Sequence, residues 1–171
     1  MNRKTLWITE TAVLLALLVG LQFVTKAMGQ FVTGSCVNLV LGVAVLTAGL
    51  WSGVTVAVLS PFCAFLVGIG PAFLPIVPMV AVGNTVLVVL LHLLCRDRKP
   101  MAYVGMAAAA VAKFVALWLL IVVVVLPMLG LPEKQQAVLS ASFTWPQLVT
   151  ALIGGVLAVS IAPTIRKALK K

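Results

Sequence analysis

Long runs of apolar residues fill most of the chain, and short polar, glycine-containing or proline-containing stretches separate them. A membrane crossing needs about 20 consecutive, mostly apolar residues in an α-helix. By this measure the pattern predicts an all-α, polytopic membrane protein with six transmembrane helices. The expected spans are residues 6–27, 37–50, 54–68, 76–95, 101–126 and 145–165, of which the second is shorter than a standard crossing.

Breaks in the apolar pattern predict the connections. Polar and small residues at 28–36 predict a loop after the first span, and Trp-Ser-Gly at 51–53 predicts a tight corner. Glycines and prolines between 68 and 78 predict a loop and a helix start, because they interrupt regular helix. Pro127 is expected to end the fifth span, and residues 130–144 are expected to form an extended polar connection.

The composition supports a membrane-embedded chain. Hydrophobic residues make up 63% of the 171 residues, charged residues make up 9%, and the mean hydropathy is +1.25. Ordinary globular domains carry about 25% charged residues, so this chain is predicted to be an integral membrane protein. No shift in composition marks a second unit, and residues 1–171 are expected to form a single integral membrane domain.

Basic residues account for the net charge of +9, and their placement predicts the orientation of the chain. With six crossings, most of them share one side of the membrane, which the positive-inside rule makes cytoplasmic. Both termini are therefore predicted to be cytoplasmic, and the charge is interpreted as a topology signal rather than a nucleic-acid-binding surface. The basic clusters are Arg3 and Lys4; Arg96, Arg98 and Lys99; and Arg166, Lys167, Lys170 and Lys171.

Motifs of the common catalytic and metal sites are missing from the sequence. It contains no GK[ST] phosphate-binding loop and no HExxH motif. Enzyme activity, a catalytic metal, a cofactor and use of ATP by this chain alone are therefore not expected. Cys36, Cys63 and Cys95 have no metal-ligand spacing and are expected to be free.

Lys113 lies near the centre of the fifth span. A charged lysine at the bilayer centre costs at least about 2.5 to 3.5 kcal/mol, so it should face a cavity, a partner or a ligand. Pairing with helix-end carbonyls, or a neutral amine, is the structural alternative. No carboxylate is predicted within the membrane, so an anionic group on a ligand would supply the missing partner.

Other polar and aromatic side chains in the spans are candidates for substrate contact. Asn84 has an amide that either a ligand or a neighbouring helix can satisfy. Trp118 suits a ligand with a flat ring. Trp145 and Gln147 suit a ligand or an interfacial belt. Asn38 is placed near the first loop, where it would line an entrance or be solvated.

Small residues form a stripe on the first predicted helix. Ala12, Ala16 and Gly20 follow one another at intervals of four residues, which places them on one helix face. Such stripes let another helix approach closely, and close packing is an important source of helix association in lipid. The stripe is expected either to pack within this chain or to dock on a partner.

Taken together, the chain resembles the substrate-binding S components of energy-coupling factor (ECF) vitamin transporters. The resemblance covers the whole chain and combines the size, the six spans and the stripe at 12, 16 and 20. It also includes Gly-Asn at 83–84, Ala-Lys-Phe at 112–114 and Phe-Thr-Trp-Pro-Gln at 143–147.

This resemblance implies a function in a prokaryotic cytoplasmic membrane. The small-residue stripe would dock on a transmembrane T component, which two ATPases drive. A small vitamin-like substrate would bind near the outer surface, enclosed by the first loop at 28–36, the connection at 68–75 and the outer parts of the last three helices. Lys113 favours a substrate with a carboxylate or phosphate.

An alternative interpretation is a small proton-coupled secondary transporter or drug-efflux subunit. In that case Glu10 would be the proton-coupling acid. The predicted topology places Glu10 at the membrane edge, and no second acid lies within the spans.

Overall fold

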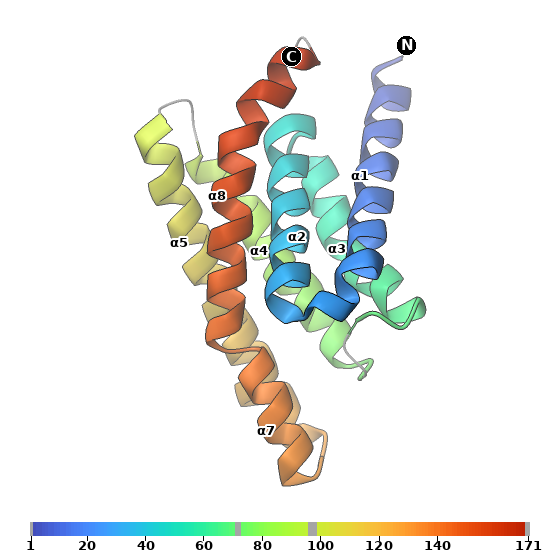
Figure 1. Ribbon diagram of the computed structural model, residues 1–171, viewed down its shortest axis with the longest axis vertical. Helices are drawn as coiled ribbons and strands as arrows, with labels where there is room; N and C mark the ends of the chain where they lie inside the picture. The colour runs from blue at the N-terminus through green and yellow to red at the C-terminus, as the bar shows by residue number, and fades with distance from the viewer. Residues whose placement is uncertain (1, 71–72, 96–98, 170–171) are drawn as a thin grey trace.

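The regular elements of the computed structural model, which describes residues 2–70, 73–95 and 99–169, are all helical (Figure 1). Longer α-helices alternate with one 3-10 turn, η1, and two π-helical segments, η2 and η3. The elements are α1 (Arg3–Thr25), η1 (Lys26–Met28), α2 (Gln30–Val43), η2 (Ala44–Ala48), α3 (Leu50–Leu66), α4 (Ile76–Leu94), α5 (Lys99–Leu117), η3 (Trp118–Val125), α6 (Leu126–Met128), α7 (Glu133–Ser142) and α8 (Trp145–Ala168).

Five helical stretches in the described ranges are long and apolar enough to cross a membrane. These stretches contain α1, α2, α4, α5 and α8. The remaining apolar helix, α3, has 17 residues and a length of about 26 Å, slightly less than the hydrocarbon thickness of about 30 Å. It packs against α1 and α4 as a member of the bundle.

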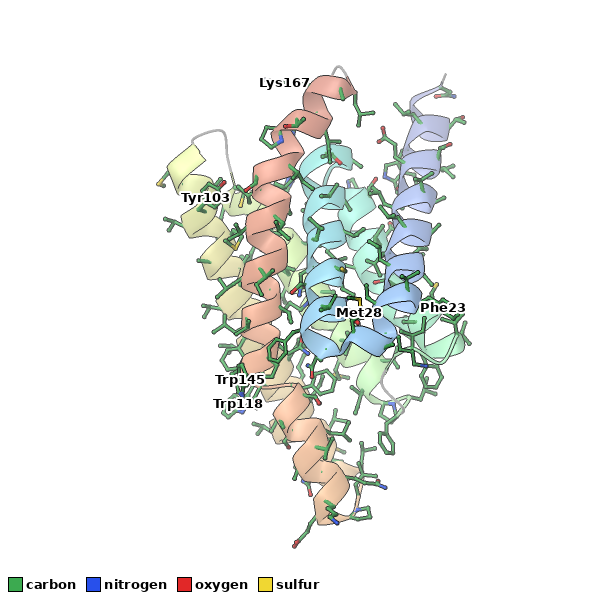
Figure 2. All side chains as sticks on the ribbon, viewed as in Figure 1. Phe23, Met28, Tyr103, Trp118, Trp145 and Lys167 are labelled. Carbon is green, nitrogen blue, oxygen red and sulfur yellow. The ribbon has the colours of Figure 1, made fainter. Side chains whose placement is uncertain are left out.

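Both ends of the chain lie at the same end of the bundle (Figure 1). At that end the Arg166 Nε donates a hydrogen bond to the Leu46 carbonyl, 2.5 Å away, and thereby ties α8 to η2. Lys167 lies near the C-terminus (Figure 2). The predicted basic residues Arg96, Arg98, Lys170 and Lys171 lie outside the described residues, as do the side chains of Arg3 and Lys99.

The turns after α1 and α2 differ from the predicted ones. Gly29 and Gly49 have φ of 87° and 93°, a left-handed conformation that favours glycine, and the next helix begins directly after each. The predicted corner at 51–53 is wrong, because α3 already starts at Leu50.

The predicted loop at 28–36 is also wrong, because α2 begins at Gln30. The polar residues that suggested a loop are satisfied inside the helical structure. Ser35 Oγ donates to the Phe31 carbonyl at 2.6 Å, and Thr33 Oγ1 donates to the Thr25 carbonyl at 2.9 Å. With η2, this stretch is long enough to cross a membrane.

Two predictions about the second half of the chain need correction. Pro127 does not end the fifth span, since it lies in α6, directly after the π-helical η3. The Leu126 N–H donates to the Ile121 carbonyl five residues earlier, and Pro127 itself has no N–H to leave unpaired. The connection at 130–144 contains helix α7, which has too few apolar positions to produce a periodic signal.

Helix α8 packs against α2 and α5, and glycine makes the contact with α2 possible (Figure 1). A Cβ atom at Gly154 would lie 2.5 Å from the Ser35 carbonyl oxygen and 2.6 Å from the Leu39 nitrogen. The backbones of the two helices therefore approach more closely than any side chain at position 154 permits.

Two clusters of buried apolar side chains hold the bundle together. The larger cluster draws on every helix from α1 through α5 and includes Leu18, Leu41, Val56, Leu87 and Ala109. The smaller cluster joins α4, the end of α5, η3, α6 and the turn before α8, and includes Ile76, Leu117, Ile121, Leu126 and Phe143. On α5, Lys113 lies one turn after Ala109 and one turn before Leu117, between the two clusters.

Gly154→Ala tests the close contact of α8 with α2. The added Cβ must push backbone atoms apart, so we expect a loss of about 1–3 kcal/mol in stability, visible as a lower midpoint of thermal unfolding in detergent. Gly20→Ala is the matched control, because a Cβ there meets no atom within 4 Å. Equal midpoints for the two variants would contradict the packing described here.

Candidate functional site

A cavity of about 390 Å³ lies at the end of the bundle away from the chain termini. Its wall combines polar side chains with apolar ones, and it draws on seven α-helices, on η1 and on the connection after α3. The lining residues are Gln22, Lys26, Gly29, Gln30, Thr33, Gly34, Val37, Asn38, Ser60, Pro61, Ala64, Ile69, Gly70, Val80, Asn84, Lys113, Leu139, Ser142, Phe143 and Gln147.

Lys113 is the centre of a buried polar cluster in the cavity wall. Its side chain is 2% exposed, and Nζ donates hydrogen bonds to the Asn38 Oδ1 at 2.6 Å and to the Asn84 Oδ1 at 2.7 Å. These short distances are typical of charge-assisted hydrogen bonds. We call Lys113, Asn38 and Asn84 the lysine cluster.

Three helices position the lysine cluster, since Asn38 lies on α2, Asn84 on α4 and Lys113 on α5. Asn38 is fixed by its amide nitrogen, which donates to the Gly34 carbonyl at 2.8 Å and to the Thr150 Oγ1 at 3.4 Å. At Gly83, beside Asn84, a Cβ would lie 2.5 Å from a methyl carbon of Leu117, so glycine brings α4 and α5 together here.

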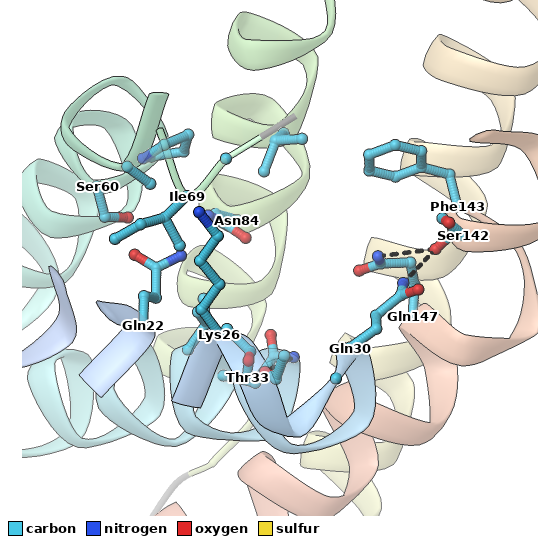
Figure 3. A pocket seen from close by; sticks show the side chains of 18 of the residues that line it. Gln22, Lys26, Gln30, Thr33, Ser60, Ile69, Asn84, Ser142, Phe143 and Gln147 are labelled. Atoms are coloured by element: carbon cyan, nitrogen blue, oxygen red, sulfur yellow. Dashed lines mark hydrogen bonds between the residues drawn. The ribbon is translucent and has the colours of Figure 1, made fainter. Parts of the chain in front are cut away.

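A second set of hydrogen bonds closes one side of the cavity (Figure 3). The amide nitrogens of Gln30 and Gln147 both donate to the Ser142 carbonyl, at 2.5 and 3.0 Å. The end of α7 is thereby joined to the starts of α2 and α8.

Lys26 closes another part of the rim. Its Nζ donates to the Gly68 carbonyl at 2.8 Å and connects η1 to the segment after α3. Unlike Lys113, Lys26 is exposed, so its charge remains partly solvated.

Gln22 and Ser60 supply polar atoms without partners. The Gln22 Oε1 and the Ser60 Oγ are buried and make no hydrogen bond to another described residue. Both residues line the cavity, and Figure 3 shows them on the side away from Ser142 and Gln147. An unsatisfied buried polar atom costs about 1–3 kcal/mol, so these atoms are suited to a ligand.

The structure brings together four of the six predicted substrate residues, since Asn38, Asn84, Lys113 and Gln147 all line the cavity. Asn38 is 1% exposed, so the alternative of a solvated side chain is wrong for this residue. Whether these residues contact a substrate stays a prediction.

Trp118 and Trp145 are not among the cavity-lining residues. They are 40% and 61% exposed, and Figure 2 shows both at the outside of the bundle. The Trp145 ring lies against Phe31, with ring centroids 5.5 Å apart. Trp145 is the first residue of α8, and its side chain is exposed, whereas Pro146 and Thr150 on the same helix are buried.

Sequence reasoning gave little weight to several cavity residues. Gln22 and Gln30, like Asn38, lie near the first predicted loop, where the sequence allows either an entrance or solvated side chains. Lys26 lies at the end of a span, where basic residues are ordinarily solvated. Ser60 had a usable signal, because it is a polar residue directly before a proline inside an apolar run. Ser142 contributes its backbone carbonyl, which no side-chain pattern predicts.

The family model for the ECF transporter, substrate-specific component, matches residues 8–166. The chain belongs to this family. No curated protein and no solved structure matches the chain significantly. The S component is thus a substrate-specific membrane subunit of an ECF transporter, as the resemblance predicted, and a transporter subunit rather than an enzyme.

On this S component the small-residue stripe faces outward. Ala12, Ala16 and Gly20 are all exposed, and a Cβ at Gly20 would have nothing within 4 Å. The buried side of α1 carries other residues, among them Thr11 and Leu18. The alternative that the stripe packs within this chain is therefore wrong.

Asn38→Leu tests whether the amides solvate the Lys113 charge. The ammonium would lose one of its two acceptors, so we expect a destabilisation of about 1.5–3 kcal/mol in thermal unfolding of the detergent-solubilised protein. The triple variant Asn38→Leu/Asn84→Leu/Lys113→Met removes the whole cluster and should recover most of this loss. If Asn38→Leu unfolds at the same temperature as the wild type, the stability of the buried Lys113 charge does not depend on Asn38.

Proposed function

We propose that this S component captures a small vitamin or related micronutrient in the cavity that contains the lysine cluster. The observation that carries the proposal is the cavity itself. Its volume of about 390 Å³ lies in the range of small-molecule sites, and it combines apolar walls with a few fixed polar groups, as ligand pockets do.

The proposed orientation places the cavity at the outer face of a prokaryotic cytoplasmic membrane. Six crossings, with α3 as the shortest, are supported by the position of both chain ends at one end of the bundle (Figure 1). Lys4, Arg166 and Lys167 lie in the terminal turns of α1 and α8, which favours a cytoplasmic location for that end. The cavity then faces the side from which a nutrient arrives.

The stripe on α1 is the proposed docking surface for a T component. Its three small residues leave a shallow, exposed strip on a helix that is otherwise rich in leucine and valine. A partner helix can approach such a strip closely, and in lipid this packing supplies association energy. Two ATPases bound to the T component would drive uptake, because this chain carries no nucleotide-binding motif of its own.

Purification in mild detergent followed by mass spectrometry tests substrate capture. We expect the wild-type S component to release one small molecule in a fixed ratio to protein, and Lys113→Ala to retain less than a tenth of it, because a fixed ligand contact is lost. Tyr103→Phe, on the same helix outside the cavity, is the control. A wild-type protein that never carries a small molecule, even from nutrient-rich cells, would contradict the proposal.

Ala16→Trp tests the docking surface. The indole would hold the partner helix away, so we expect the variant to lose association with a co-expressed T component in pull-down, while small-molecule capture is unchanged. Val104→Trp adds the same bulk at a position on α5 that is 67% exposed and should associate normally. Normal association of the Ala16 variant would assign docking to another surface.

A further inference from the structure

We infer that the substrate is a small monocarboxylic acid that also carries a hydrogen-bond donor, with its carboxylate held by Lys113 and Asn84. The inference rests on the proposed function, since it names the substrate class of the same cavity. It follows from the N–H groups of the lysine cluster that have no acceptor in the described part of the chain, from the charge of the cavity wall, and from the buried atoms of Gln22 and Ser60 that have no hydrogen-bond partner there.

Two nitrogen atoms of the lysine cluster, Lys113 Nζ and Asn84 Nδ2, still have N–H groups to donate to a ligand. A lysine ammonium has three N–H groups, and Lys113 gives two of them to Asn38 and Asn84. The Asn84 amide nitrogen makes no hydrogen bond to another described residue, whereas that of Asn38 is fully used by Gly34 and Thr150. Because Asn84 accepts from Lys113 directly, these two nitrogen atoms are neighbours, an arrangement suited to the two oxygens of a carboxylate.

The charge of the wall favours an anion with a single charge. Lys113 is the one fully buried cation among the described lining residues, and that lining contains no aspartate or glutamate. Lys26 also lines the cavity, but its ammonium lies at the exposed rim, where it donates to the Gly68 carbonyl and where water screens its charge. A carboxylate neutralises one ammonium, whereas a phosphate dianion would leave excess charge in a poorly solvated site, where unpaired charge is costly.

Gln22 and Ser60 define the second polar feature of the substrate. The Gln22 Oε1 can only accept a hydrogen bond, and the Ser60 Oγ can accept or donate. A substrate hydroxyl can donate to the Gln22 Oε1 and accept from the Ser60 Oγ, and a substrate amide can do the same with its N–H and its carbonyl. Ser60 is 1% exposed, so bulk water does not reach its side chain.

The rest of the cavity wall is largely aliphatic. Val37, Ala64, Val80 and Leu139 line it, and Phe143 is the one aromatic ring among the described lining residues. Since Trp118 and Trp145 lie outside the lining, the cavity provides little surface for ring stacking. A short, mostly aliphatic body between the carboxylate and the donor fits this wall.

Thermal unfolding of the detergent-solubilised full chain, with a matched compound library, tests the inference. The library contains hydroxyl- or amide-bearing carboxylic acids, their primary carboxamides and the corresponding phosphomonoesters. We expect at least one acid to raise the unfolding midpoint and to bind about 30-fold or more tightly than its carboxamide, because the carboxamide lacks the charge that pairs with Lys113.

Variants assign the effect to the residues. Lys113→Met and Asn84→Asp should each weaken binding of that acid by about 30-fold or more, the second because it places a carboxylate where the substrate's would bind. Tyr103→Phe should bind normally. Ser60→Ala should weaken binding of the hydroxyl-bearing acid and leave the acid without its hydroxyl unaffected. If Lys113→Met fails to fold, the carboxylate inference is tested by Asn84→Asp and by the comparison of each acid with its carboxamide.

Different failures have different meanings. Carboxamides that bind as tightly as acids, or phosphomonoesters that bind more tightly, would overturn the carboxylate inference and leave substrate capture intact. If no library compound binds, the small molecule released from the purified protein tests the inference. A carboxylic acid without a phosphate group supports it, and a neutral or phosphorylated compound overturns it. Absence of any released molecule and of any binding would overturn the proposed function itself.

Discussion

The structure depends on how a lysine charge is accommodated inside a bundle of apolar helices. An ammonium removed from water needs acceptors or a counter-ion, and the described residues around Lys113 supply two amide oxygens. Those oxygens come from α2 and α4, while Lys113 lies on α5. Three helices are thus held at one depth by one polar centre, and the cavity opens beside it.

Glycine lets the helices that carry the two amides approach their neighbours closely. Gly154 allows α8 to lie against the backbone of α2 at the level of Asn38, and Gly83 allows α4 to lie against Leu117 on α5. Ala12, Ala16 and Gly20 are the same type of residue, but they lie on a helix surface that the described part of the chain leaves exposed. Small residues therefore serve internal packing on α4 and α8 and leave a free strip on α1.

Much of the fold and part of the site could be predicted from the sequence. Apolar runs located all the main helices. The cost of burying a charge drew attention to Lys113 and that of burying an amide to Asn84, and these two residues lie together in the lysine cluster. The start of α2 was missed, because Gln30, Thr33 and Ser35 suggest a loop until their hydrogen bonds are known. For the same reason Asn38 was placed in an entrance rather than in the buried cluster.

The other errors have a common physical origin. Hydropathy reports how apolar a segment is but not which way each side chain faces, so it could not tell that Trp118 and Trp145 leave the bundle while Gln22 and Ser60 enter it. Helix α7 is polar on most sides, and its backbone forms a helix without an apolar stripe. Orientation of this kind is set by packing between distant segments.

The carbonyl of Ser142 has a mechanical consequence. Ser142 is the last residue of α7, the element that projects farthest from the bundle (Figure 1). Its carbonyl accepts hydrogen bonds from side-chain amides on two other helices. These two hydrogen bonds link the position of α7 to Gln30 and Gln147 in the cavity wall. A displacement of α7 relative to α2 and α8 therefore requires that one or both of these hydrogen bonds change.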